Sequence, residues 1–199
     1  MSRSQRLVVA LILNLSLVAA LVAVGVSAHS LGVAAAGGDY LADAAGIGLA
    51  LSAYPLSRRF PRAHSIAALV NAGWLVVLSV VIAVTAVARL GSGTGHVHGL
   101  PVVIVSSMAT LVMVTTALVL KIDLDDDDDD GDQRLSSRAV LLDTVADAAA
   151  AAGVALTGLV IWATHGLDWL DPAVALVIAL VIGYHAAHLV RDIRHSIRR

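Results

Sequence analysis

The sequence predicts an all-α integral membrane protein with six transmembrane helices and cytoplasmic N- and C-termini. Residues of the set AVILMFWYC make up 58% of the chain, and charged residues only 14%, against about 25% charged residues in soluble domains. Eight of the 15 acidic residues lie between Asp123 and Asp132, so the remainder is almost entirely apolar. Because a spanning helix needs about 20 apolar residues, six spans with short loops fill residues 1–199 as one domain.

The predicted spans follow the apolar stretches between polar or turn-forming residues. Pro55 and Pro61 bracket a tight basic turn, Gly91–Gly99 form a flexible loop, and Asp171-Pro172 opens the last helix, where an early proline is tolerated. The six spans are Leu7–Ala28, Leu31–Tyr54, Ala63–Ala88, Leu100–Leu120, Ala139–Thr164 and Pro172–Val190.

The distribution of Lys and Arg predicts the orientation. With the N-terminus inside and six alternating spans, 12 of the 13 basic residues fall on the cytoplasmic side, and only Arg89 falls outside. An odd number of spans would misplace several of them. The alternative of a cleavable signal peptide, suggested by Arg3, Arg6 and the segment Val26-Ser27-Ala28 after an apolar stretch, is disfavoured because that stretch is a full span long.

Two matched pairs of aspartates lie inside predicted spans. Asp39 and Asp43 are four apart in the second span, and Asp143 and Asp147 are four apart in the fifth, so each pair shares one helix face. One Asp inside a bilayer costs about 2.5–3.5 kcal/mol, and four would cost on the order of 10 kcal/mol unpaired. Since neither span contains Lys or Arg, metal ions or protons are the candidate partners. A purely structural role, in which the aspartates hydrogen-bond between helices, is the alternative.

Several function classes are excluded by what the chain lacks. There is no Cys, which rules out disulfides and thiolate metal sites. The net charge of −2 and the absence of a basic patch argue against a nucleic-acid partner. No activated nucleophile, phosphate-binding loop or HExxH motif is present, so the chain is not expected to be an enzyme or to carry a cofactor.

Three stretches resemble the transmembrane domain of the cation diffusion facilitator family of metal exporters. SLGVAAAGGDYLADA is similar to the family's second span, RAVLLDTVADAAAAAGVALTGLVI to its fifth, and WLDPAVALVIALVIGYHAAHLVRD to its sixth, which begins with Asp-Pro. The resemblance implies that Asp39, Asp43, Asp143 and Asp147 form a transport site for a divalent cation. It also implies a homodimer in the plasma (inner) membrane, and a cytoplasmic C-terminal domain that this chain is expected to lack.

The expected mechanism is metal/proton exchange. Four carboxylates in one dry site cannot all be ionised when the site is empty, so the empty site holds protons, and a metal ion expels them on binding. An all-oxygen site suits Mn²⁺ better than an imidazole site would, while Zn²⁺ also binds carboxylates. Zn²⁺ and Mn²⁺ are therefore the favoured cargo, with Cd²⁺, Co²⁺ and Fe²⁺ left open. A membrane scaffold, or a proton-coupled carrier of another solute, remains the alternative.

The loop at 121–138 and the eight histidines have plainer interpretations beside the functional ones. Asp125–Asp130 form either a solvated linker or a weak metal collector at the cytoplasmic entrance, and the two roles are compatible. His96 and His98 form an HxH pair in the outer loop, but two ligands without a third are weak evidence of a site. The other histidines lie near predicted span ends and are expected to be interfacial: His29, His64, His165, His185, His188 and His195.

Overall fold

The described part of the chain consists of six α-helices and contains no strand, which confirms the all-α prediction. The computed structural model describes the backbone of residues 3–57, 63–93, 95–126 and 131–197, and the side chains of residues 15–45, 69–93, 95–119, 121, 138, 140–188 and 190–191. The helices are α1 (Arg3–Ser27), α2 (Leu31–Ser57), α3 (Ala63–Ser92), α4 (Gly99–Asp126), α5 (Gly131–Thr164) and α6 (Leu170–Ile197).

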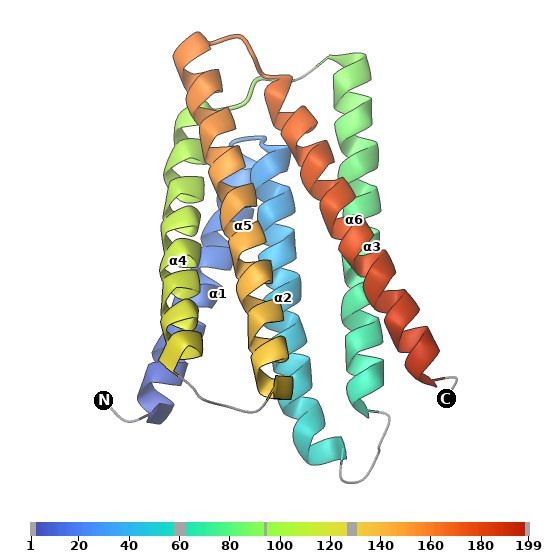
Figure 1. Cartoon of the computed structure of the whole chain (residues 1–199). Coiled ribbons are helices and arrows are strands. Elements are labelled where there is room, and N and C mark those ends of the chain that lie inside the picture. The colour runs from blue at the N-terminus through green and yellow to red at the C-terminus, as the bar shows by residue number, and fades with distance from the viewer. Residues whose placement is uncertain (1–2, 58–62, 94, 127–130, 198–199) are drawn as a thin grey trace.

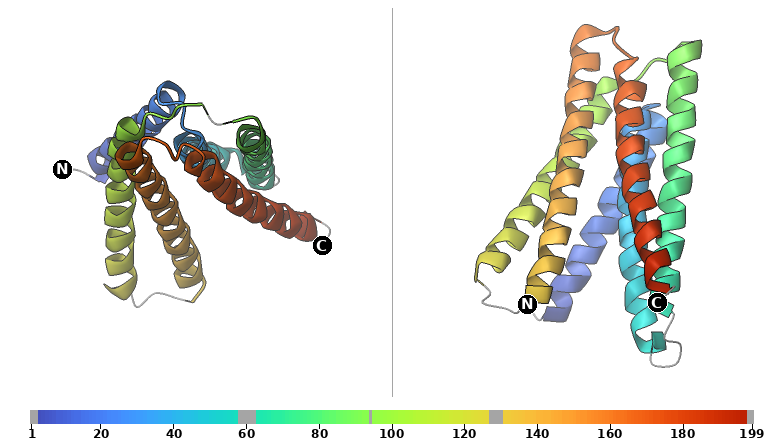
Figure 2. Two further views of the ribbon diagram at one scale, coloured as in Figure 1. Left: turned by 90° about the horizontal axis from the view of Figure 1, so that it is seen from above. Right: turned by 45° about the vertical axis from the view of Figure 1, so that its right-hand side comes forward.

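Successive helices run in opposite directions along one bundle (Figure 1). We call the end that holds residues 28–30, 93, 95–98 and 165–169 between helices the hairpin end, and the opposite end, where α1 begins and α6 ends, the terminal end. α2 contacts α1, α3, α5 and α6, whereas α4 packs along α5 and α3 packs along α6 (Figure 2). The second helix therefore occupies the centre of the bundle.

Four helices are long and apolar enough, over their described side chains, to cross a membrane. They are α3, α4, α5 and α6, with spans at Leu69–Ser92, Gly99–Val119, Val140–Thr164 and Leu170–His188. Large apolar side chains cover the outward faces of these helices, including Val84, Leu111 and Leu142, each more than 60% exposed. A surface of this kind is stable in lipid and would aggregate in water, so the chain is a multi-pass membrane protein.

Several helices extend beyond the predicted spans. α2 runs past its predicted end at Tyr54 to Ser57, and α6 begins at Leu170, two residues before Pro172. Most of the predicted basic turn between Pro55 and Pro61 lies outside the described residues. α4 continues to Asp126 and α5 begins at Gly131, so most of the predicted loop at 121–138 is helical. Hydropathy marks only the part of a helix that lies in lipid, whereas polar residues continue the same helix into water. The predicted loop was therefore too long.

Glycines allow α4 and α5 to approach closely near the hairpin end. A Cβ at Gly158 would lie 2.6 Å from Val102 Cγ1 and 3.1 Å from the backbone oxygen of Gly99. A Cβ at Gly99 would lie 2.6 Å from the backbone oxygen of Gly158. Two glycines thus face each other, and the two backbones meet where any side chain would intrude.

We expect Gly158→Ala to destabilise the fold by about 1–3 kcal/mol, because the new methyl group would have to displace Val102 and backbone atoms of α4. Gly153→Ala is the matched control, since nothing lies within 4 Å of a Cβ at that position of α5. Unfolding of both purified variants by a denaturing detergent measures the difference. Equal unfolding midpoints for the two variants would contradict the close α4–α5 contact.

Candidate metal centre

Carboxylates from α2 and α5 meet in the bundle. One carboxylate oxygen from each of Asp43, Asp143 and Asp147 lies within 4.8 Å of the other two. Asp143 and Asp147 are one helical turn apart on α5, so they face the same neighbour, and that neighbour is Asp43 on α2. The spacing pattern in the sequence thus corresponds to a group of acidic side chains that approach one another in three dimensions.

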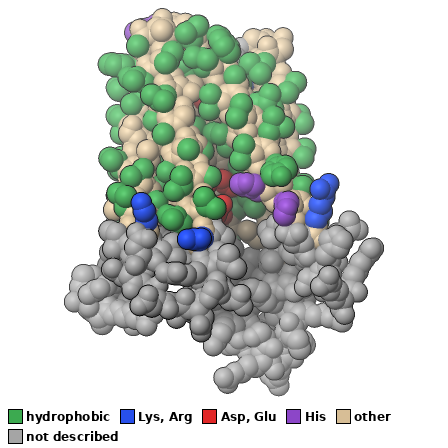
Figure 3. Space-filling model, in the orientation of Figure 1, with side chains coloured by type: hydrophobic (Ala, Val, Ile, Leu, Met, Phe, Trp, Pro, Cys, Tyr) green, Lys and Arg blue, Asp and Glu red, His purple; other side chains and the backbone are tan. Residues whose placement is uncertain are grey.

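Asp39 lies beside this group without belonging to the closest three. It is one turn from Asp43, about 6 Å along the axis of α2, on the side of the hairpin end. It interacts electrostatically with Asp43, Asp143 and Asp147. Asp39, Asp43 and Asp147 are half-buried, and Asp143 is exposed. Acidic side chains are visible in a recess toward the terminal end of the described surface (Figure 3).

No positive charge balances these four aspartates within the described part of the chain. None of their carboxylates forms a salt bridge or accepts a hydrogen bond there. Carboxylates held this close repel one another unless a proton or a cation lies between them. Oxygen donors at this spacing are the ligands that hard and borderline divalent cations take in proteins.

Small residues before Asp39 bring α2 close to two neighbouring helices. A Cβ at Gly37 would lie 3.1 Å from Leu21 Cβ on α1, and a Cβ at Gly38 would lie 2.7 Å from Leu78 Cδ1 on α3. On α5, Ala148 and Ala151, one and four residues after Asp147, are buried. Close contacts therefore fix the section of α2 that carries the acidic pair.

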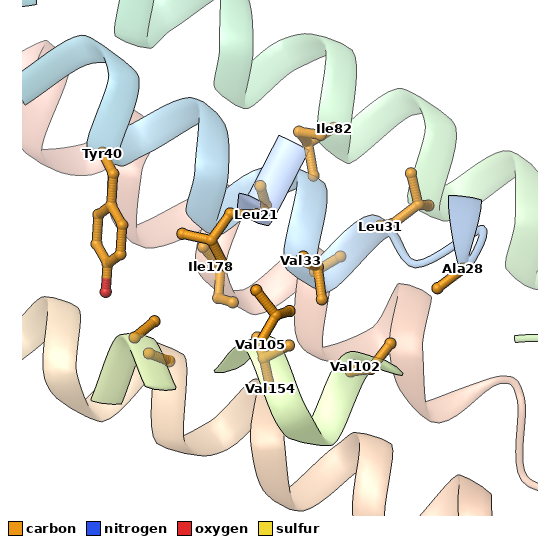
Figure 4. Packing of buried hydrophobic residues seen from close by; sticks show 14 of the residues in the cluster. Leu21, Ala28, Leu31, Val33, Tyr40, Ile82, Val102, Val105, Val154 and Ile178 are labelled. Carbon is orange, nitrogen blue, oxygen red and sulfur yellow. The ribbon is translucent and has the colours of Figure 1, made fainter. Parts of the chain in front are cut away.

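Tyr40 also belongs to this region, although sequence reasoning did not select it. It is only 3% exposed, and its side chain extends from α2 toward α5 (Figure 4). Its hydroxyl donates a hydrogen bond of 3.3 Å to the backbone oxygen of Asp147. This bond joins the two acidic helices at the level of the site. The available signal was a tyrosine, with its polar tip, next to Asp39 in an otherwise apolar stretch.

We expect Tyr40→Phe to lower the free energy of unfolding by about 1 kcal/mol, the usual net contribution of one hydrogen bond. Phenylalanine keeps the buried ring and removes only the donor to Asp147. Tyr184→Phe is the matched control, because Tyr184 is 69% exposed on α6. Detergent-induced unfolding compares the two variants, and an effect no larger than that of the control would show that the bond does not stabilise the α2–α5 contact.

The predicted HxH pair lies at the hairpin end, away from the aspartates. The rings of His96 and His98 pack edge to face with centroids 5.8 Å apart. His96 Nδ1 lies 3.4 Å from Asp168 Oδ2, and the same carboxylate accepts a 3.1 Å hydrogen bond from the Val97 backbone N–H. His165 lines the same surface cavity of about 340 Å³ as this pair. Asp168 and His165 are thus neighbours that sequence spacing did not indicate.

The remaining described histidines are exposed at helix ends or on α6. His29 and His165 have positive φ angles of 56° and 53° and lie two residues after α1 and one residue after α5, a conformation that often ends helices. His185 and His188 are exposed and lie near Tyr184. The side chains of His64 and His195 lie outside the described residues, as do those of Asp125–Asp130, for which a metal-collecting role was considered.

Comparison with known proteins identifies the family. The sequence profile described as the cation efflux transmembrane domain matches residues 7–197. No curated protein matches the sequence. The profile covers nearly the whole chain, including both helices that carry the acidic pairs, and its members are membrane transporters of metal cations, not enzymes. The chain therefore belongs to the cation efflux family.

Proposed function

We propose that the protein exports a divalent transition-metal cation from the cytoplasm in exchange for protons. The observation that carries this proposal is the approach of Asp43, Asp143 and Asp147 within 4.8 Å without a balancing positive group among the described residues. Membership of the cation efflux family supports a metal cation as the cargo. Asp39, Asp43, Asp143 and Asp147 are the proposed ligands and proton acceptors.

Exchange follows from competition for the same oxygens. With no metal bound, protons relieve the repulsion between neighbouring carboxylates. A divalent cation binds the ionised form and releases those protons. If the loaded site opens to one side and the protonated site to the other, a proton gradient drives the metal outward. Carboxylate ligands favour Mn²⁺ and also accept Zn²⁺, which makes these two the first cations to test.

We infer that all six helices span the membrane and that both termini are cytoplasmic. Six helices of alternating direction place the start of α1 and the end of α6 at one end (Figure 1). Exposed Lys121, Arg138 and Arg191 belong to the ends of α4, α5 and α6 nearest that terminal end, in agreement with the positive-inside rule. The hairpin end then faces the exterior. A homodimer in the plasma membrane and a single functional domain over residues 1–199 are further proposals, which rest on the family resemblance.

Uptake into everted vesicles tests the proposal, with Zn²⁺, Mn²⁺, Cd²⁺, Co²⁺ and Fe²⁺ compared and the proton flux recorded beside each. We expect metal uptake that depends on an imposed proton gradient, together with proton release when metal is added to the purified protein. A membrane scaffold would give neither signal. A proton-coupled carrier of another solute would move protons with that solute and would not respond to metal.

A further inference from the structure

Asp171 is a buried carboxylate that joins the start of α6 to the start of α2. It is 1% exposed, and its partners are 139 to 141 residues away in the sequence. Its Oδ1 accepts a 2.5 Å hydrogen bond from the Ser30 hydroxyl and a 3.2 Å bond from the Gly32 N–H, and its Oδ2 accepts a 2.7 Å bond from the Leu31 N–H. We call this group of four residues the α2 clasp.

The clasp supplies the hydrogen bonds that the first turn of α2 cannot make within the helix. The first N–H groups of any helix lack a partner in the same helix. Here Asp171 accepts from Leu31 and Gly32, while the Ser30 hydroxyl accepts a 3.2 Å bond from the Val33 N–H. The carboxylate also places a negative charge at the positive end of the α2 dipole. The carboxylate that accepts from the first N–H groups of a helix usually comes from the same helix, whereas here it comes from α6.

Helices α2, α5 and α6 pack tightly against one another at the clasp. A Cβ at Gly32 would lie 3.2 Å from Asp171 Oδ1 and 3.3 Å from Val154 Cγ2, which belongs to α5. The preceding turn is held by a further helix and by the connection before α4, because Arg89 of α3 donates a 2.6 Å bond to the His29 carbonyl and the His98 N–H donates a 3.1 Å bond to the Ala28 carbonyl. The clasp therefore fixes where α2 begins relative to α5 and α6.

The same helix carries half of the metal centre. α2 is continuous from Leu31 through Asp39 and Asp43, so these aspartates lie about 12 Å and 18 Å along its axis from the clasp. Because a helix is stiff over this length, a change in depth or rotation at its first turn is transmitted to both carboxylates. Their partners, Asp143 and Asp147, are on α5, against which Gly32 packs.

We propose that Asp171 is a positioning residue for transport: by holding the first turn of α2 against α5 and α6, it sets Asp39 and Asp43 opposite Asp143 and Asp147. The inference rests on the proposed function, because it assigns Asp171 a role in forming that site. Asp171 does not touch the cargo. It acts through the position of α2.

The test measures Co²⁺ binding to the purified full-length protein. The visible absorption spectrum of the bound Co²⁺ reports its coordination geometry. We expect Asp171→Asn to weaken Co²⁺ binding by about tenfold, the lower end of what supporting residues contribute around metal ligands, and to change the absorption spectrum. Asp168→Asn is the matched control. Its carboxylate lies three residues before Asp171, in the 165–169 connection, and contacts His96 and the Val97 N–H rather than α2, so binding should stay within about twofold of wild type.

A second pair of variants decides the matter if Asp171→Asn does not fold. Ser30→Ala removes one clasp bond, whereas Ser79→Ala removes a buried hydroxyl whose hydrogen bond, within the described part of the chain, goes to the Val76 carbonyl of its own helix. We expect weaker Co²⁺ binding for the Ser30 variant alone, and a change in its Co²⁺ spectrum.

The unfolding midpoint of each variant is measured together with its Co²⁺ affinity. The comparison shows whether Asp171 positions the metal ligands or only stabilises the fold. A lower midpoint with unchanged Co²⁺ affinity and spectrum, in Asp171→Asn or in Ser30→Ala, would overturn the inference and leave the proposed function intact. If wild type binds neither Co²⁺ nor, in competition with it, Zn²⁺ or Mn²⁺, or if Asp147→Asn binds these cations as wild type does, the proposed function fails and the inference fails with it.

Discussion

Replacing Asp147 by Asn is expected to reduce transport of every tested metal by at least about a hundredfold. Asn keeps the shape of the side chain but cannot be ionised, so the site loses both a ligand oxygen of full charge and a proton acceptor. Residues that merely support metal ligands contribute about 10–100-fold to affinity, and a direct ligand should exceed that range. Metal uptake into everted vesicles, normalised to the amount of inserted protein, measures the loss.

The folded bundle should survive this substitution. Asp147 makes no side-chain hydrogen bond or ion pair with the described residues, and it is repelled by Asp39, Asp43 and Asp143. Removing its charge therefore relieves repulsion, and the unfolding midpoint should be equal to that of wild type or higher. Asp168→Asn, far along the chain in the 165–169 connection, is the control with an equal change in charge. Undiminished transport by Asp147→Asn would favour the scaffold interpretation.

The helices were predictable because lipid imposes a simple requirement on the sequence. Every backbone polar group in a bilayer must be bonded internally, so each long apolar stretch is a helix, and α1 to α6 all appear where apolar stretches were found. The helix ends were not predictable in the same way. α5 begins at Gly131 rather than Ala139 because the residues between them are polar but compatible with a helix, and hydropathy does not detect them.

The acidic pairs were predictable because i and i+4 share a helix face whatever surrounds them. That rule pairs Asp143 with Asp147 and Asp39 with Asp43. The structure adds that Asp43 is the member of the α2 pair that lies in the group of three with Asp143 and Asp147. Sequence spacing could not determine how deeply α2 sits beside α5. That depth depends on contacts between distant residues, such as Gly38 with Leu78.

Tyr40 and Asp171 are two residues whose structural roles could not be predicted from the sequence. The bond from Tyr40 to the Asp147 backbone joins residues 107 positions apart, and the bond from Ser30 to Asp171 joins residues 141 apart. In the sequence, Asp171 was noticeable only as the residue before Pro172 at a helix start. Its role at the start of a different helix follows from the fold, because a carboxylate buried to this extent needs several donors.

Replacing Asp143 by His is expected to shift the preference of the transporter from Mn²⁺ toward Zn²⁺ by about tenfold, equivalent to on the order of 1.4 kcal/mol, without stopping exchange. Imidazole is a borderline donor that suits Zn²⁺, whereas Mn²⁺ favours carboxylate. Asp143 is the exposed member of the group, so the larger ring has room. Parallel uptake assays with the two cations, under one proton gradient, give the ratio directly.

The same substitution should also lower the number of protons released per metal ion. With one of four acidic groups gone, the empty site is less crowded with negative charge and holds fewer protons near neutral pH, so fewer leave when metal binds. Asp143→Asn is the control that separates the two effects: it removes the same charge without supplying an imidazole, and it should lower proton release without favouring Zn²⁺. If Asp143→His exchanges Zn²⁺ and Mn²⁺ in the wild-type ratio and with the wild-type proton yield, Asp143 is not a ligand, and the site must be built from the other three aspartates.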